Sequence, residues 1–168
     1  MATRLLRLLT CALVFGSPLR GVAEEAKPNS VPARYEIAAI RTHAFFHESG
    51  RFDERELQDP RLALWNVGIG GGDAGENISN TLVLVDVVGP SFVSRVRGAI
   101  ELVATADGYP EVKIAVPIYT LFTEKHKVTA PFLVYGIQCG DLHLSARVRI
   151  RDKLVAAGKG LIPFRCGE

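Results

Sequence analysis

Apolar and polar positions alternate along most of the chain after residue 33, which predicts a protein built from β-strands. Short β-branched runs bounded by Gly, Pro and Asp recur there, whereas the 3.6-residue period of an amphipathic helix is scarce. The pattern predicts eight strands, at about 34–46, 62–67, 81–88, 97–106, 111–122, 129–137, 141–150 and 154–164. The segment 81–88 is nearly all β-branched or Leu, which is typical of a central strand.

A hairpin is predicted in the middle of the chain. Asp107 and Gly108 separate two of the predicted strands, and an Asp-Gly pair favours a tight turn between antiparallel partners. Pro110 and Pro117 fall within or next to the second of these strands, and proline donates no hydrogen bond to a ladder. The second strand is therefore expected either to lie at the edge of a sheet or to break near Pro117.

A second hairpin is predicted at the C-terminal end, where the alternation is most regular. Its even positions are apolar and its odd positions polar: Leu142, Leu144, Ala146, Val148 and Ile150 alternate with His143, Ser145, Arg147 and Arg149. A two-residue turn at Asp152 and Lys153 would place Cys139 opposite Cys166. We therefore expect a disulfide bond between these cysteines, which would close the open end of the hairpin.

The first 23 residues have the three parts of a secretory signal peptide. Arg4 and Arg7 give a positive start, 5–15 is apolar, and small residues precede the expected cleavage after Ala23. The apolar stretch is too short to span a bilayer, so no transmembrane anchor is expected. Cleavage would remove one of the three cysteines and leave the pair described above, as is typical of an exported protein.

The expected mature chain reads as one domain. Residues 24–33 are polar and contain two prolines, which indicates a flexible lead-in, and 34–168 has the usual size of a single domain. Short alternating strands without a βαβ rhythm predict an all-β fold, an antiparallel β-sandwich of about seven or eight strands with immunoglobulin-like or C2-like topology.

The charge of the mature chain argues against nucleic-acid binding. The three arginines of the signal peptide would leave with it, so 17 of the 20 basic residues remain against 18 acidic ones. A nearly neutral domain without a basic stripe lacks the electrostatic footprint of a nucleic-acid binder.

Two groups of residues are candidate metal ligands. His43 and His47 are four residues apart, on one side of a strand or helix, so a zinc-dependent enzyme is one hypothesis; the alternative is a solvated face. The Gly-rich segment 68–80 carries the oxygen ligands that calcium prefers, Asp73, Glu76, Asn77 and Asn80. Its spacing differs from that of an EF-hand, and a solvated connection is the alternative reading.

No motif for nucleophilic hydrolysis is present, since the chain lacks a Gly-x-Ser-x-Gly sequence. Phe45 and Phe46 are adjacent on a predicted strand and must point to opposite faces, so one of them is available to a protein or carbohydrate partner. The sequence therefore predicts an exported, non-enzymatic binding or structural module without a required cofactor. A calcium-dependent module and a metal-dependent enzyme remain the alternatives.

Overall fold

The computed structural model describes residues 34–59, 61–62, 78–90, 98–118, 126–136 and 140–164. All of them belong to one compact unit, Val31–Glu168. Their regular structure is β throughout, and the strands form two antiparallel sheets of four strands each. Among the described residues, no helix has the length and hydropathy to cross a membrane.

The first sheet has the strand order β2-β1-β3-β6. Its members are β1 (Glu36–Phe46), β2 (Arg51–Phe52), β3 (Ile78–Val88) and β6 (Lys127–Tyr135). β3 pairs along its length with β1 on one side and β6 on the other, which confirms the central position predicted from its β-branched composition. The predicted strand at 62–67 falls almost wholly outside the described residues.

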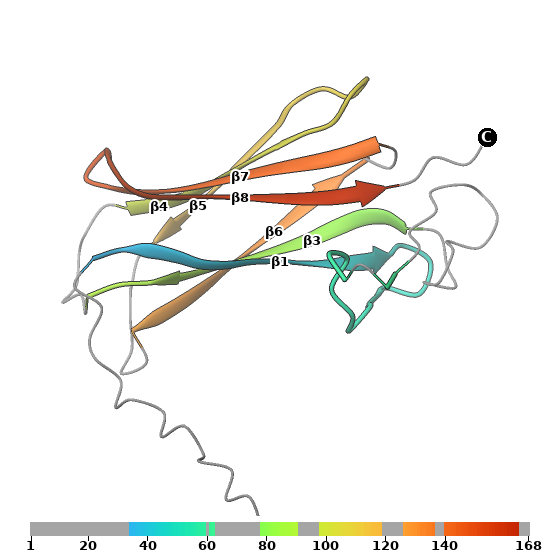
Figure 1. The fold of residues 1–168 in the computed structure, drawn as a ribbon, viewed down its shortest axis with the longest axis horizontal. Helices are drawn as coiled ribbons and strands as arrows, with labels where there is room; N and C mark the ends of the chain where they lie inside the picture. The colour runs from blue at the N-terminus through green and yellow to red at the C-terminus, as the bar shows by residue number, and fades with distance from the viewer. Residues whose placement is uncertain are drawn as a thin grey trace, which may run out of the picture. The chain divides into compact units, whose positions relative to one another are not determined.

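The second sheet has the strand order β5-β4-β7-β8. It contains β4 (Gly98–Thr105), β5 (Val112–Ile118), β7 (Gly140–Ile150) and β8 (Lys153–Phe164). β5 pairs with β4 alone, so the edge position predicted from its prolines is confirmed. In the turn between β4 and β5, Gly108 has a positive φ of 80°, which glycine adopts without strain. Figure 1 shows this sheet lying over the layer of β1, β3 and β6.

The fold is a β-sandwich with immunoglobulin-like connectivity. Apart from the short β2, the first, second and fifth strands in chain order form one sheet, and the third, fourth, sixth and seventh form the other. This matches an arrangement in which strands A, B and E face strands C, F and G, with an extra strand beside C. The predicted fold class is therefore confirmed.

The core lies between the two sheets and follows the period-two alternation of the strands. Its largest fully buried side chains are Ile100, Leu102, Phe132, Leu142, Leu144 and Ile162, packed with the inward-facing valines of β3. Phe46 joins this core, whereas Phe45 lies on the other face of β1, with its ring centroid 4.9 Å from that of the exposed Phe52. The two adjacent phenylalanines thus point to opposite faces, as predicted.

The turn of the C-terminal hairpin differs from the prediction. Arg151 and Asp152 have positive φ angles of 49° and 63°, and Ile150 pairs with Lys153, so the two-residue turn lies one position earlier than expected. A register shift follows at Arg149, after which the ladder continues to its last described pair, Gly140 with Phe164. Cys139 and Cys166 lie just beyond that pair in sequence, outside the described residues, so the disulfide stays a prediction.

Candidate functional site

A hollow of ≈ 440 Å³ lies on the outer face of the second sheet, where β4, β7 and β8 run side by side. Two neighbouring rows of cross-strand partners form its walls. One row is Thr105, His143 and Leu161, and the other is Val103, Ser145 and Lys159. The floor is completed by the strand segments at Leu144 and Gly160.

The alternation of β7 explains why these side chains face outward. Leu142, Leu144 and Ala146 are buried in the core, so the residues between them, His143 and Ser145, must project from the opposite face. The alternation along residues 142–150 predicts this polar face but not the hollow. The hollow depends on the pairing of β7 with β4, which is about forty residues earlier in the chain, and local alternation carries no information about that pairing.

The polar side chains of the hollow have no partner among the described residues. Thr105, His143, Ser145 and Lys159 form no side-chain hydrogen bond or ion pair there. A concave site with a few convergent polar groups among aliphatic ones, here Val103 and Leu161, is typical of a ligand-binding site. These groups are therefore available to a ligand.

The charges around the hollow favour an anion. Arg147 lies diagonally across the β7–β8 ladder from Lys159 on the same face, and neither cation forms an ion pair within the described residues, although Glu101 is the cross-strand partner of Arg147 on β4. The neighbouring Arg149, in contrast, is neutralised by Glu101, with 3.0 Å between Nε and Oε2. Two unpaired cations on one face attract a negatively charged group, although Asp141 offsets part of this field at the His143 end.

Asp141, His143 and Ser145 alternate on the outer face of β7, and their types are those of a hydrolytic triad. No hydrogen bond joins any two of the three. A triad requires such contacts, at about 2.6–3.2 Å, to move a proton from the serine. In this structure the three side chains do not make the contacts of a triad.

The two histidines predicted as metal ligands lie near the end of β1 and in the turn that follows it, and the metal site stays a prediction. The Nδ1 atom of His43 lies 3.1 Å from the carbonyl oxygen of Asp53 and 3.2 Å from that of Arg55, so it donates its proton to the backbone of the loop after β2. His47 lies beyond the end of β1, in the exposed turn 47–50. No group of three His, Cys, Asp or Glu side chains suited to a metal occurs among the described residues.

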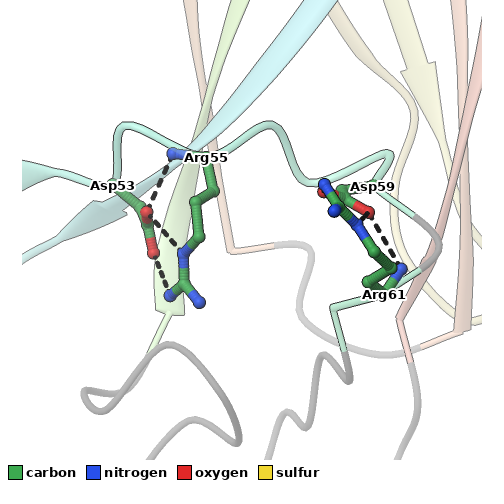
Figure 2. A network of polar contacts seen from close by, with 4 residues as sticks. All are labelled: Asp53, Arg55, Asp59 and Arg61. Carbon is green, nitrogen blue, oxygen red and sulfur yellow. Dashed lines mark hydrogen bonds and ion pairs between the residues drawn. The ribbon is translucent and has the colours of Figure 1, made fainter. Parts of the chain in front are cut away.

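The loop that His43 holds contains a repeated Asp-x-Arg unit. In both copies one aspartate oxygen accepts the backbone N–H of the arginine at 2.9 Å, and the carboxylate also binds the guanidinium, as Figure 2 shows. The pairs are Asp53 with Arg55 and Asp59 with Arg61. Between them, Leu57 is buried and donates its N–H to the carbonyl oxygen of Thr42 at 2.8 Å, which fixes the loop against β1.

The predicted calcium ligands cannot be compared as a set. Asp73, Glu76 and Asn77 lie outside the described residues. Asn80 lies on β3 between Phe45 of β1 and Tyr135 of β6, and it is buried and has an interaction partner. The calcium site stays a prediction.

A buried carboxylate forms a separate network on the outer face of the first sheet. Asp86 accepts hydrogen bonds from Arg41 (two, at 3.1 Å) and from the hydroxyl of Thr129 at 2.6 Å, and its Oδ2 lies 2.9 Å from Nζ of Lys127. Burial disfavours the charged form of Asp86, but these contacts outweigh it and hold its pKa at about 2. The network joins β1, β3 and β6 and leaves no polar group of Asp86 open to a ligand.

Comparisons with known proteins leave the chain without a family. The sequence matches no family model and no curated protein. Among solved structures, it is similar to part of a protein described as a β-galactosidase from Bacteroides fragilis, with a TM-score of 0.34 and 9% identity. That match covers 49% of this chain and 13% of the other.

Proposed function

We propose that this chain is an exported, non-enzymatic binding module that holds an anionic ligand in the hollow formed by β4, β7 and β8. The observation that carries the proposal is the group of unpartnered polar side chains at the hollow, above all Lys159. An ammonium group attracts a carboxylate or phosphate, and the hydroxyls of Thr105 and Ser145 can donate hydrogen bonds to it. The aliphatic walls supply apolar contact beside the charge.

Export and the disulfide bond belong to the same proposal. The signal-like segment 1–23 supports export. Cys139 directly precedes Gly140 and Cys166 comes two residues after its partner Phe164, so the two cysteines are one position out of direct opposition in this register but close enough in sequence to support a bridge. A secreted recognition domain with a rigid sandwich and a closed terminal hairpin presents the hollow without needing a metal.

Chemical-shift mapping on the ¹⁵N-labelled secreted chain tests the proposal. The probes are N-acetyl-glutamate amide and its neutral counterpart N-acetyl-glutamine amide, at roughly millimolar concentrations, where a weak single-site interaction is visible. We expect the carboxylate to shift the amides of Ser145 and Lys159, and the neutral probe to shift them much less. Shifts spread over the whole surface, or equal effects of the two probes, would show that the hollow does not select an anion.

A matched pair of variants completes the test. Lys159→Gln removes the cation of the hollow, whereas Lys153→Gln removes an exposed cation at the start of the same strand. The carboxylate response should disappear with the first variant and persist with the second. If both variants retain it, the hollow is not the site.

A further inference from the structure

The four edges of the two sheets differ in how they are protected. Unpaired backbone groups at an edge attract further strands, so soluble proteins block them with proline, charged residues or covering loops. β5 carries Pro117, and β6 carries Pro131 at its centre. The edge of β1 is covered in part by β2 and by the following loop, whose amides at Asp53 and Leu57 donate to the carbonyls of Ala44 and Thr42.

Among the described residues, the edge of β8 has no central proline and no loop bonded to its backbone, and the charged residues on the strand are Lys153 and Lys159. The strand has twelve residues, and its one proline, Pro163, is next to its last residue. Within the described part of the chain, the backbone of β8 bonds to β7 alone. Two of the four large apolar side chains that are exposed there lie on this strand, Leu154 at 54% and Leu161 at 46%, the others being Phe52 and Tyr135. A long open edge with exposed apolar side chains is the feature that natural sheets avoid unless another strand binds there.

We infer that β8 binds an extended segment of a partner protein, which adds a strand to the second sheet and carries an acidic side chain opposite Lys159 and an apolar one opposite Leu161. Main-chain hydrogen bonds to the edge would supply affinity, and alternate side chains would supply specificity. Lys159 and Leu161 both line the hollow, so the partner's acidic side chain is the anionic ligand proposed above, and the inference rests on that proposal.

Charge determines the choice of partner. Lys153 and Lys159 both lie on β8, and Arg147 adds a third cation on the face beside it. A second copy of this chain would bring the same two lysines to the shared edge, whereas an acidic segment is attracted by them, because opposite charges on paired strands stabilise and like charges destabilise. The cations therefore disfavour self-association and favour an acidic strand.

A synthetic peptide of about eight residues, a usual strand length, tests the inference. The antiparallel register requires an apolar residue two positions before the acidic one, as in Thr-Val-Thr-Leu-Thr-Glu-Thr-Val. Fluorescence anisotropy with the secreted chain should show saturable binding that weakens as salt is added. Replacing the peptide's Glu by Lys should weaken binding roughly tenfold, and the Lys159→Glu variant should reverse this preference. A preference for Glu that survives Lys159→Glu would overturn the inference.

Two N-methylated forms of the peptide separate strand addition from simple side-chain binding. In an antiparallel pair, alternate residues direct their N–H groups to the partner strand. Methylating that set should abolish binding, whereas methylating the other set should preserve it. If both forms bind equally well, the peptide occupies the hollow through its side chains alone; strand addition is then wrong while the proposed anion site survives.

Two other results would also overturn the inference. If the peptide fails to bind while N-acetyl-glutamate amide still shifts the hollow, the ligand is anionic but is not an added strand. If sedimentation shows a dimer of the secreted chain and the β8 amides exchange more slowly as the dimer forms, the occupant of the edge is a second copy.

Discussion

Asp86 is a buried carboxylate whose charge is held by residues from both neighbouring strands. Its pKa of about 2 in the folded protein lies below the value of about 3.9 in an unfolded chain. The stabilisation is therefore complete above about pH 4 and is lost as pH falls toward 2. We expect Asp86→Asn to lower the free energy of unfolding near pH 7 by on the order of 2 kcal/mol, with the difference shrinking between pH 4 and 2. Urea unfolding of both proteins across this range measures it.

Asp59 provides the control for this prediction. Its pKa is also held at about 2, by hydrogen bonds from Arg61 two residues away, a local pair drawn on the right of Figure 2. The pair lies at the surface. A contact between residues so close in sequence survives in part in the unfolded chain and contributes less to stability. Asp59→Asn should therefore change stability less than Asp86→Asn. Equal losses would contradict the assignment of the Asp86 effect to its long-range partners.

Thr42 carries a buried hydroxyl group whose removal should change the stability of the fold. Its hydroxyl is buried in the core and, like that of Thr81, has no hydrogen-bond partner among the described groups. A buried unsatisfied hydroxyl costs free energy, so Thr42→Val, which keeps the shape, should raise the free energy of unfolding by about 1 kcal/mol. The matched Thr129→Val should lower it, because Thr129 donates to Asp86. Chemical denaturation of both variants gives the two signs, and destabilisation by Thr42→Val would mean that its hydroxyl has a partner.

At the scale of elements, two glycines set how closely β8 approaches β1. A Cβ atom added to Gly158 would lie 3.0 Å from Cγ2 of Ile37 and 3.3 Å from its Cβ, whereas one added to Gly160 would first meet the flexible end of Gln58, at 3.4 Å. Neither glycine has a positive φ, so alanine is strained by contact alone. We expect Gly158→Ala to be less stable than Gly160→Ala by about 1 kcal/mol or more, since overpacking a fixed β-branched side chain is costly. Thermal unfolding compares the two variants, and the opposite order would show that the sheets yield at Ile37.

Strand positions followed from residues whose effect is local. Pro117 has no N–H in any context, which placed β5 at an edge, and the run of β-branched residues placed β3 at the centre. The C-terminal turn was misplaced because Arg151 and Asp152 are not the Asn-Gly or Asp-Gly pair that marks a type I′ turn. β2 was not predicted, because a strand of two residues is too short to show an alternation of apolar and polar positions.

At the scale of the whole molecule, the sandwich could be predicted but the hollow could not. Alternation shows which side chains of a strand are buried, and eight such strands without helices leave few architectures. The hollow requires Thr105 beside His143 and Ser145 beside Lys159, pairings set by register between strands. The two metal hypotheses rest on spacing in sequence, and spacing does not show that Nδ1 of His43 contacts the backbone of the loop after β2.

The predicted disulfide bond between Cys139 and Cys166 should affect the stability of the whole domain. The described ladder ends at Gly140 and Phe164, one residue after Cys139 and two residues before Cys166 in sequence, and a bridge there would close a loop of about 28 residues. In the chain-entropy model such a loop is worth on the order of 3 to 4 kcal/mol, a large share of the stability of one domain. Thiol titration of the proposed mature chain, residues 24–168, recovered from an exporting host and denatured, should find no reactive thiol before reduction and two after it. Reduction should lower the thermal midpoint by the same amount as replacing both cysteines with serine, and two free thiols in the untreated protein would show that the hairpin is held by its ladder alone.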